Sequence, residues 1–312
     1  MKSVCLAILN YNGRCHLELL LPSALEAARL YPGYAGVVVL DNRSTDNDLE
    51  WITSAYPDVD VIVAPKNDFL YSYNWLLPQL QEEIVVLLNN DLRLKDDFIF
   101  PLISHFSNPD VFAVSATSRD WDDADYTWGP IGLNCHHGLY YWDYDQSRQE
   151  PCYTLFCSGG FMAVSSEKYL KINGFNRLFY PAYGEDLDLC FRAWRMGWKC
   201  IFEPASVVLH REHGSFNADG NKRAARLMQR CQLLFQWSTL PKEANLLERC
   251  SFHLLQMLRS VRGANNYFIK ITFSTFFEWL NIKKNYRHLK ISKDEMTEIL
   301  RAIKSPLVIE KN

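Results

Sequence analysis

The sequence lacks the patterns that mark secreted, membrane-spanning or repetitive proteins. Its nine cysteines are scattered without a C-x-x-C pair, and such an odd, irregular set favours reduced thiols in a cytoplasm, most of them small core residues. No run of 18 or more apolar residues occurs, so we expect no membrane span. A signal peptide is not expected, because the first apolar run is short and ends at Asn10. Internal repeats and low-complexity linkers are also missing.

Charge is unevenly placed along the 312 residues. Residues 1–214 carry 16 Lys/Arg and 28 Asp/Glu, a net charge of −12, whereas residues 215–312 carry 17 and 8, a net charge of +9. An acidic region that binds an anionic ligand suggests a divalent metal between the two. The basic region faces an anionic membrane or a polyanionic acceptor, or it is only a solvated helical face. The overall charge of −3 is small, and we expect no nucleic-acid partner.

Three apolar runs end in polar residues. Residues 84–88 lead into Asn89, Asn90 and Asp91, and residues 4–9 and 37–40 lead into similar Asn- and Asp-rich segments. Apolar runs rich in β-branched residues are typical of strands buried on both faces of a parallel sheet. Open parallel sheets bind ligands at the carboxyl ends of their strands. The sequence therefore predicts a site for a polar, phosphorylated ligand at this edge.

Strand and helix patterns alternate through the first two thirds of the chain, which predicts an α/β fold with a mostly parallel sheet. Further strands are expected at 59–64, 111–116 and 201–210, and helices at 17–30, 75–81 and 184–197. An aromatic stretch at 119–152 is a long structured loop or a small hairpin. From about residue 216 amphipathic helices follow, so we divide the chain into an α/β domain, 1–216, and a C-terminal helical region, 217–312.

Two clusters of ionisable residues are candidates for chemistry. Glu185, Asp186 and Asp188 crowd the first turn of a predicted helix, where carboxylates also simply stabilise the helix dipole and Asp188 pairs with Arg192. His210 follows the last predicted strand and is a structural hydrogen-bonding group or a metal ligand. Asp91 with a neutral imidazole and phosphate oxygens is a reasonable ligand set for Mn²⁺ or Mg²⁺.

Taken in order, these motifs resemble family 2 glycosyltransferases of the GT-A fold, an inverting family that includes rhamnosyltransferases. The resemblance covers about residues 1–216 and rests on five loose motifs in the right order and a histidine after them, at residues 8–12, 39–46, 88–91, 158–160 and 184–192 and at His210. It implies that residues 1–216 form a nucleotide-sugar-binding catalytic domain with a Rossmann-like, mostly parallel central sheet flanked by helices, here with a C-terminal helical extension. Two departures stand out: Asn89 replaces the first metal-binding carboxylate, and residues 67–74 lack a glycine where Phe69 or Leu70 stands.

The resemblance also implies roles for individual residues. Asp186 is the expected catalytic base, with Glu185 beside it, and Asp91 and His210 are the expected ligands of Mn²⁺ or Mg²⁺. Nucleotide binding falls to Asn10, Tyr11, Asn12, Asp41, Asn42, Asn67, Asn89 and Asn90. Contacts to the acceptor or the sugar are expected from Trp128, Trp142, Gly159, Gly160 and Arg192, although the tryptophans also suit packing of the loop onto the domain.

The function that the resemblance implies is transfer of a sugar from a UDP- or dTDP-sugar to a hydroxyl of a saccharide or lipid-linked acceptor. Such an enzyme would take part in the biosynthesis of surface polysaccharide. It would act in the cytoplasm, including at the inner face of the cytoplasmic membrane. A sugar-nucleotide-forming nucleotidyltransferase is an alternative, although residues 10–14 match its Gly-rich basic loop poorly. A non-catalytic sugar-nucleotide-binding relative is another, because of Asn89. The aromatic stretch at 267–280 lies on a membrane, packs on the catalytic domain or forms a homodimer.

Overall fold

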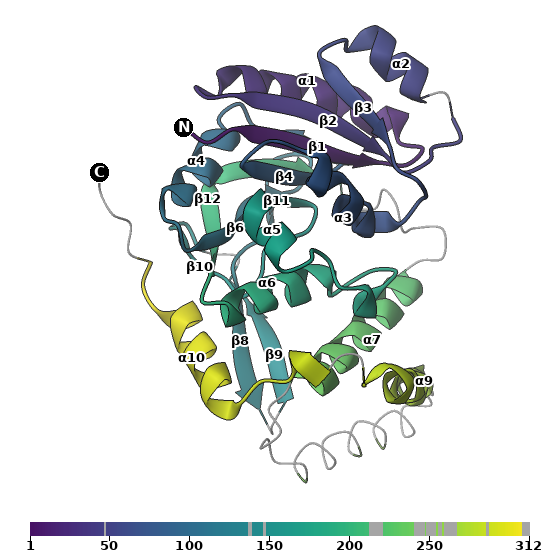
Figure 1. The fold of residues 1–312 in the computed structure, drawn as a ribbon, viewed down its shortest axis with the longest axis vertical. Helices are drawn as coiled ribbons and strands as arrows, with labels where there is room; N and C mark the ends of the chain where they lie inside the picture. Colours follow the sequence, from purple (N-terminus) through teal and green to yellow (C-terminus); the bar gives the residue numbers. More distant parts are fainter. Residues whose placement is uncertain are drawn as a thin grey trace.

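A computed structural model describes residues 1–46, 48–136, 139–145, 148–211, 221–239, 247, 254, 258, 267–284 and 287–307. These residues form an α/β fold around one large sheet (Figure 1). The strands are β1 (Val4–Asn10), β2 (Ala35–Asp41), β3 (Val59–Val63), β4 (Ile84–Asn89), β5 (Leu92–Leu94), β6 (Val111–Arg119), β7 (Tyr126–Trp128), β8 (Ile131–His136), β9 (Leu139–Tyr144), β10 (Cys152–Tyr153), β11 (Phe161–Ser165) and β12 (Lys199–His210).

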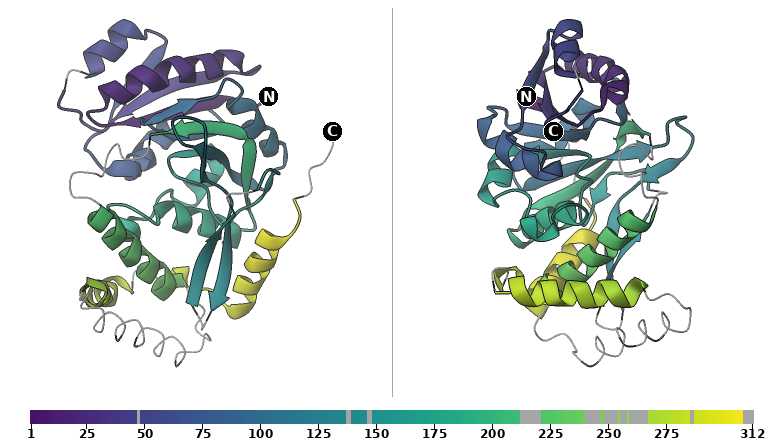
Figure 2. Two further views of the ribbon diagram at one scale, coloured as in Figure 1. Left: turned by 180° about the vertical axis from the view of Figure 1, so that it is seen from behind. Right: turned by 90° about the vertical axis from the view of Figure 1, so that its right-hand side faces the viewer.

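The helices lie mostly on the two faces of that sheet, and several are short (Figures 1 and 2). They are α1 (Arg14–Leu30), α2 (Asp48–Ala55), α3 (Tyr73–Leu76), α4 (Ile99–Ser104), α5 (Ser166–Lys171), α6 (Glu185–Arg195), α7 (Asn221–Thr239), α9 (Tyr267–Ile282) and α10 (Lys293–Lys304). Single 3₁₀ turns are η1 (Phe69–Ser72), η2 (Leu77–Gln79), η3 (His105–Ser107), η4 (Arg177–Phe179) and η6 (Arg287–Leu289).

The order of strands in the main sheet is β10-β12-β6-β11-β4-β1-β2-β3. Strands β4, β1, β2 and β3 are parallel, as are β6 and β12, and β11 runs antiparallel between the two groups. Because β1, β2 and β4 are parallel and in close register, their polar carboxyl ends meet at one edge of the sheet. The predicted strand-rich α/β fold and the expected meeting of those ends are confirmed.

Alternate residues of the buried strands face two separate hydrophobic clusters. In β1, Leu6 and Ile8 pack with α1 and α4, whereas Cys5 and Ala7 pack with Tyr73 and the α6 side. This period of two follows from the pleat of a strand, and a strand that is apolar on both faces needs cover on both. The two layers of helices in Figure 2 supply that cover.

The aromatic stretch is a hairpin with short flanking strands rather than a structureless loop. Strands β8 and β9 pair from Ile131 opposite Tyr144 to His136 opposite Leu139, and β7 and β10 pair with strands of the main sheet. Ile131 and Leu133 are buried, so one face of the hairpin belongs to the core. The helix expected at 75–81 is wrong in extent, because α3 gives way to a 3₁₀ turn that contains Pro78.

The C-terminal helices share the core of the sheet domain in the part of the chain that is described. The rings of Phe235 on α7 and Phe191 on α6 lie 5.1 Å apart, and Arg195 of α6 binds Glu295 of α10 at 2.7 Å. Part of the region in which amphipathic helices are expected, residues 240–266, falls outside the described residues except for Leu247, Leu254 and Leu258. None of the helices described here combines the length and the apolar character that crossing a bilayer requires.

Candidate active site at the carboxyl edge of the sheet

Neighbouring asparagines join the ends of β1 and β4. Asn10 is fully buried, and its Oδ1 accepts a bond of 2.9 Å from Nδ2 of Asn90. The backbone carbonyl of Asn10 also accepts a bond of 2.7 Å from the amide of Asn42 at the end of β2. Gly13 passes directly over this pair, and a Cβ there would lie 2.0 Å from Nδ2 of Asn90. The amides thus tie three strand ends together, and only glycine fits above them.

A second group of polar contacts surrounds Ser44. Its backbone amide donates to Oδ2 of Asp41 at 3.0 Å, and its hydroxyl accepts bonds from Nδ2 of Asn10 and from the amide of Asn12. Asn12 adopts a left-handed φ of 49° and accepts a bond from the amide of Thr45. Oδ1 of Asp41 is buried and, among the described residues, has no hydrogen-bond partner. A buried acceptor of that kind is a natural place for a ligand hydroxyl or N–H to bind.

The loop that follows β3 holds Asn42 and Asn67 within the fold. Nδ2 of Asn42 donates to the carbonyl of Phe69 at 3.2 Å, and the hydroxyl of Ser72 donates to Oδ1 of Asn42. Oδ1 of Asn67 accepts a bond from the amide of Phe69 at 3.4 Å. Phe69 has a φ of 53°, so a bulky residue occupies the left-handed conformation that glycine prefers. Tyr11 is half exposed at the edge of this region.

Asp91 and His210 meet where β4 and β12 end. Nε2 of His210 lies 3.5 Å from Oδ1 of Asp91, which is too long for a good hydrogen bond. That carboxylate oxygen is buried and has no partner within the described residues, while the backbone carbonyl of Asp91 accepts a bond from the amide of Arg211. An orphaned carboxylate oxygen facing an imidazole is a donor set that fits a divalent cation such as Mn²⁺ or Mg²⁺.

Three consecutive residues link this pair to the acidic helix. The amide of Gly159 donates to Oδ2 of Asp186 at 3.3 Å, and the carbonyl of Gly160 accepts a bond of 2.8 Å from the amide of Asn89. The ring of Phe161 lies 6.3 Å from the ring of His210. A Cβ on Gly160 would lie 2.7 Å from Nδ2 of Asn89, so glycine is needed there. Asp186, Asn89 and His210 are therefore neighbours of one short segment.

The two carboxyl groups at the start of α6 have different surroundings. Burial raises the pKa of Asp186 to about 6, and bonds from the amides of Leu187 and Gly159 oppose a larger rise. Burial and the adjacent Asp186 raise the pKa of Glu185 to about 8. Glu185 is almost completely buried, and one of its oxygens has no partner in the described residues. Both carboxyl groups therefore hold a proton more tightly than an exposed carboxyl group does, and Glu185 holds it more tightly than Asp186.

Arg192 is engaged in the fold. Its guanidinium binds Asp188 at 2.7 Å and donates to the carbonyls of Ile172 and Gly174, both at 2.6 Å. Asp188 is fully buried, so this ion pair fixes the loop before α6 to the helix. The expected pairing of Asp188 with Arg192 is confirmed. With all three nitrogens used in this way, Arg192 supports the site rather than facing a sugar.

The aromatic hairpin reaches the same region. Trp128 makes edge contacts with the rings of Tyr144, Phe156 and Phe161, at centroid distances of 5.8, 5.8 and 5.9 Å. Its indole Nε1 is buried without a partner among the described residues. Burial raises the pKa of Tyr144, and the nearby charge of Asp186 adds to this, so the two residues lie in the same region. Trp142 is partly buried against the core under the hairpin.

Comparison with known proteins identifies this arrangement. The family model described as glycosyl transferase family 2 matches residues 5–172, more than half of the chain. The chain belongs to that glycosyltransferase family. A second model, described as the N-terminal domain of galactosyltransferase, matches residues 136–213, which include Gly159, Asp186 and His210.

Two curated relatives of this glycosyltransferase are rhamnosyltransferases. The chain is 26% identical over 237 residues to N-acetylglucosaminyl-diphospho-decaprenol L-rhamnosyltransferase of Mycobacterium tuberculosis. The match covers 67% of this chain and 76% of the relative. The chain is 34% identical over 58 residues to rhamnosyltransferase WbbL of Escherichia coli, covering 19% of this chain and 22% of that protein.

Solved structures show that the glycosyltransferase has the GT-A fold. A mannosyltransferase from Pyrobaculum calidifontis, solved with GDP-Man and Mn²⁺, matches with a TM-score of 0.57 and 16% identity over 97% of this chain and 86% of its own. GalNAc-T7, solved with UDP, GalNAc and Mn²⁺, matches with a TM-score of 0.55 and 15% identity. The match covers 73% of this chain and 47% of the GalNAc-T7 chain.

Sequence reasoning missed Ser44, Tyr144 and Phe161 as parts of the glycosyltransferase site. Ser44 lies within the motif at residues 39–46, but nothing in the sequence indicates that it contacts several strand ends. Tyr144 belonged to an aromatic stretch from which only the tryptophans were chosen. Phe161 follows the Gly159–Gly160 pair directly, so the start of a strand after two glycines was the available signal.

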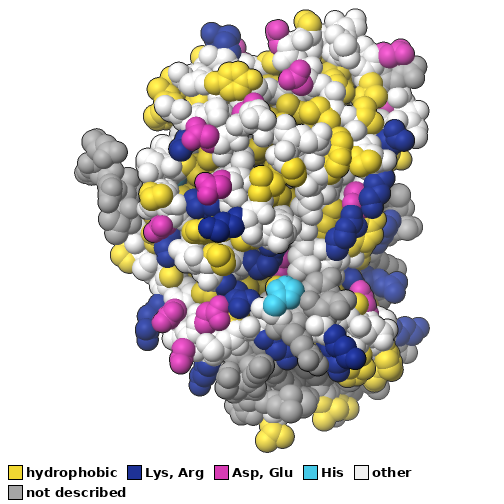
Figure 3. Space-filling model, viewed as in Figure 1, with side chains coloured by type: hydrophobic (Ala, Val, Ile, Leu, Met, Phe, Trp, Pro, Cys, Tyr) yellow, Lys and Arg dark blue, Asp and Glu magenta, His cyan; other side chains and the backbone are white. Residues whose placement is uncertain are grey.

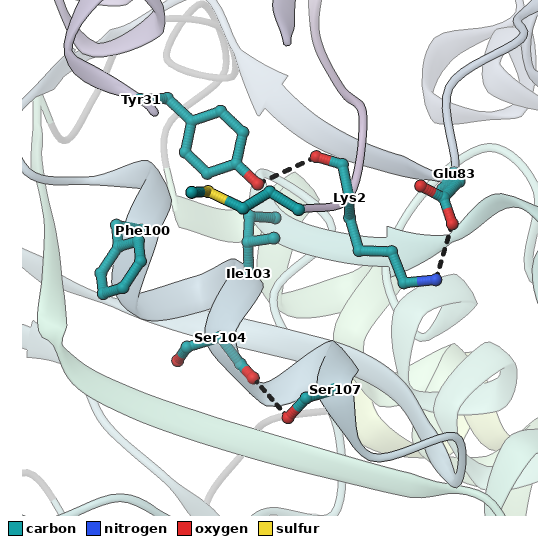
Figure 4. Close-up of a pocket in the computed structure, with 8 residues that line it drawn as sticks. Lys2, Tyr31, Glu83, Phe100, Ile103, Ser104 and Ser107 are labelled. Atoms are coloured by element: carbon teal, nitrogen blue, oxygen red, sulfur yellow. Dashed lines mark hydrogen bonds and ion pairs between the residues drawn. The ribbon is translucent and has the colours of Figure 1, made fainter. Parts of the chain in front are cut away.

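A pocket lies elsewhere in the glycosyltransferase, near the amino ends of β1 and β4 (Figure 4). In it Tyr31 donates to the carbonyl of Lys2 at 2.9 Å, and Lys2 binds Glu83 at 2.6 Å. The wall on the other side comes from α4 and η3, with Phe100, Ile103, Ser104 and Ser107. Ligands of open α/β sheets bind at the carboxyl ends of the strands, so this pocket is not the candidate active site.

Proposed function

We propose that this glycosyltransferase inverts the anomeric centre of a nucleoside-diphosphate sugar as it transfers the sugar to an acceptor hydroxyl. One observation carries the proposal: residues 159–161 contact the ionised Asp186 at one end and His210 at the other, with Asn89 between them. A base is thereby held close to the groups suited to a pyrophosphate. Attack from the side opposite the diphosphate inverts the sugar in one step without a covalent enzyme intermediate.

Donor binding falls to the polar ends of β1, β2 and β4. The buried Oδ1 of Asp41 accepts a bond from the base or the ribose, and backbone groups near Asn10, Asn12 and Asn90 line the nucleotide. Tyr11 closes the exposed edge. UDP- or dTDP-sugar is the donor that the family resemblance favours. The two similar structures were solved with UDP and with GDP-Man, so their likeness alone does not select the base.

Mn²⁺ or Mg²⁺ fits between Asp91 and His210. The support is the Oδ1 of Asp91 that lacks a hydrogen-bond partner among the described residues, the imidazole at 3.5 Å, and the Mn²⁺ with which both similar structures were solved. When bound, a divalent cation neutralises negative charge that develops on the leaving diphosphate. Asn89 adds an amide rather than a second carboxylate, so we expect weaker metal binding than a pair of carboxylates gives.

Asp186 accepts the proton of the acceptor hydroxyl as that oxygen attacks the anomeric carbon. The amides of Gly159 and Leu187 hold its two oxygens, which fixes the carboxylate without neutralising it. Glu185 is protonated at neutral pH, so it adds no second negative charge beside the attacking oxygen. Trp128 and Tyr144 form the wall beside the base, where their rings suit a sugar face. Trp142 and Gly159 are further acceptor-side contacts in this proposal.

Replacing the base tests the proposal. Asp186→Asn keeps the size of the side chain but removes the proton acceptor, so kcat should fall roughly 10²–10⁴-fold. Donor binding, measured as the shift in melting temperature with UDP- and dTDP-sugars, should stay near the wild-type value. Asp97→Asn, at an exposed carboxylate on the approach to α4, is the matched control and should leave kcat unchanged. Wild-type turnover in Asp186→Asn would remove the assignment.

The alternatives are separated by the products. A nucleotidyltransferase would form sugar nucleotide from nucleoside triphosphate and sugar phosphate, and a non-catalytic relative would bind donor without turnover. A panel of sugar nucleotides assayed with Mn²⁺ for hydrolysis and transfer distinguishes the three. Release of nucleoside diphosphate with formation of an inverted glycoside supports the proposal, and triphosphate-dependent sugar-nucleotide synthesis contradicts it.

The acceptor side of the proposal rests on α9. This helix buries Thr272 and Thr275 and exposes Phe273, Phe276 and Phe277, by 52, 40 and 62%. A helix with hydroxyl groups inward and aromatic rings outward is unusual for a surface in contact with water. Figure 3 shows hydrophobic and basic side chains together at the lower right, where Figure 1 places α9.

We assign this face of α9 to an anionic lipid surface. Lys270 and Lys284 are exposed toward the two ends of the aromatic stripe, which suits acidic headgroups around inserted rings. The curated relative from Mycobacterium tuberculosis is named for a decaprenol-linked substrate, which favours a lipid-linked acceptor and the cytoplasmic face of the membrane here. Arg230 of α7 pairs with Glu278 of α9 and donates to the carbonyl of Leu178, which joins α9 to the segment before the base.

Vesicle binding tests this assignment. The double variant Phe273→Ser with Phe277→Ser should lose sedimentation with phosphatidylglycerol vesicles, while Phe100→Ser, an equally exposed ring on α4, should not. Phosphatidylcholine vesicles should bind the wild type less, because the basic residues then lack partners. Equal binding of the double variant and the wild type contradicts the assignment. A concentration-dependent dimer that the double variant abolishes, without vesicle binding, would assign the face to a second copy.

A further inference from the structure

A cluster of three cysteines lies directly behind the catalytic helix. The sulfurs of Cys157, Cys190 and Cys200 all lie within 4.8 Å of one another, and each residue is fully buried. They come from three separate elements: the loop before β11, helix α6 and strand β12. Among the described cysteines, Cys5, Cys15, Cys152 and Cys231 take no part in the cluster.

The three thiols interact with one another and with few other polar groups. The amide of Cys157 donates to Sγ of Cys190 at 3.4 Å, and its own thiol donates to the carbonyl of Ile201 at 3.7 Å. Burial raises the pKa of Cys157 and of Cys200. Burial also acts to raise the pKa of Cys190, but the two neighbouring thiols and the nearby Arg192 outweigh it and lower that pKa. The three sulfurs therefore face one another in a dry, mostly apolar setting, with Arg192 as a nearby positive charge.

We propose that Cys157, Cys190 and Cys200 bind one soft metal ion, Zn²⁺ or Cu⁺, as a trigonal thiolate site. A Zn–S bond of about 2.3 Å places three sulfurs around one ion roughly 4 Å apart, so the observed spacing needs shifts of less than about 1 Å. In the described chain, neither histidine nor carboxylate joins the cluster. An all-sulfur set selects soft ions and rejects the hard Mg²⁺ and Mn²⁺ that suit Asp91. Binding releases the thiol protons to water.

The position of the cluster gives such an ion a structural effect. Cys157 comes two residues before Gly159, Cys190 lies one helical turn beyond Asp186, and Cys200 lies on the strand that ends at His210. An ion held by all three would tie together the elements that carry the base and the proposed metal ligand. Because an ion that binds only the folded chain stabilises it, the loaded protein should melt at a higher temperature than the ion-free protein. This holds whether or not the proposed glycosyl transfer is correct.

Metal content of the full chain tests the proposal. The protein is expressed in cells supplied with Zn²⁺ or with copper, purified with a thiol reductant and without oxygen, and analysed by mass spectrometry of the elements. We expect one ion per chain in the wild type, with the two growth conditions deciding between Zn²⁺ and Cu⁺. Cys15→Ser, at an exposed cysteine, is the matched control and should keep the ion. Cys190→Ser should lose it.

A second measurement keeps the result interpretable if a buried variant folds poorly. The wild type alone, titrated with Cd²⁺ during refolding, should develop thiolate-to-metal absorption that saturates at one equivalent, with circular dichroism confirming the fold. A folded wild type that holds no ion under either growth condition and gives no such absorption overturns the proposal. Retention of the ion by Cys157→Ala with Cys190→Ala and Cys200→Ala together also overturns it, since the ion would then lie elsewhere.

Discussion

The two sides of the active site use similar residue types in opposite ways. At the ends of β1, β2 and β4, neutral amides such as those of Asn10 and Asn90 bond to one another and form a rigid polar edge. At the start of α6, Glu185 and Asp186 are set among apolar neighbours that raise both pKa values. In the proposed reaction, the first side binds a ligand that brings its own charge, and the second side accepts a proton.

This difference explains where stability is lost for function. Amides that hydrogen-bond to one another cost little free energy to bury, whereas burying a carboxyl group away from water costs free energy. Buried carboxyl groups of this kind are found mainly where they have a chemical role. The amides at the strand ends should therefore change little over a pH range that alters the ionisation of Glu185 and Asp186. Substitutions on the two sides should then separate donor binding from proton transfer.

The largest effect is expected on the donor side. Asp91→Asn removes the only carboxylate of the proposed metal pair, so kcat/KM with Mn²⁺ should fall about 10³-fold, equivalent to several kcal/mol of lost charge stabilisation. Steady-state rates across a Mn²⁺ titration measure this. Asn89→Asp restores a second carboxylate and should lower the Mn²⁺ concentration needed for half-maximal rate. An unchanged Mn²⁺ dependence in both variants would place the metal elsewhere.

The pH dependence of the rate is next in size. A base with a pKa of about 6 is ionised above that pH and protonated below it, so kcat should fall about tenfold for each pH unit below 6. The asparagine amides at the strand ends do not titrate, so their contribution to donor affinity should change much less over the same range. Rates measured between pH 4.5 and about 8 provide the check. A flat profile through pH 5 would argue that Asp186 is not the base.

Glu185→Gln should change stability more than donor binding. The folded-state pKa of Glu185 is raised to about 8, so its protonated form contributes stability that is present at low pH and lost as pH rises through 8. The glutamine variant lacks this loss, so between pH 5 and 9 it should lose about 4 kcal/mol less stability than the wild type, at about 1.4 kcal/mol for each pH unit up to 8. Urea unfolding at pH 5 and 9 measures it. If the wild type and the glutamine variant lose the same free energy of unfolding between the two pH values, Glu185 does not cause the pH dependence.

The smallest effect is expected at the aromatic wall. Trp128→Phe keeps a ring among Tyr144, Phe156 and Phe161 but removes the indole N–H that lacks a partner in the described chain. If that N–H binds acceptor, KM for acceptor should rise about tenfold, the value of one ordinary hydrogen bond. Trp75→Phe, at a partly exposed indole on α3, serves as the comparison. An unchanged KM with a lower melting temperature would assign Trp128 to packing.

Much of the fold was predictable because the strands are buried on both faces. Continuous apolar runs such as 84–88 indicate strands of this kind, and the polar residues after them mark the edge of the sheet where ligands bind. The short elements were not predictable: Pro78 breaks a helical pattern, and β5 has three residues. Tyr144 and Phe161 were missed because their importance depends on which distant residue they contact. Arg192 was misjudged for the same reason, since its carbonyl partners leave no mark in a sequence.

The backbone between Gly159 and Phe161 also couples the positions of two side chains that are distant in the sequence. Two residues of extended chain separate α-carbons by at most about 7 Å, and these two positions contact Asp186 and His210. A change in the length of this segment would therefore displace both contacts at once, which makes it a poor place for an insertion.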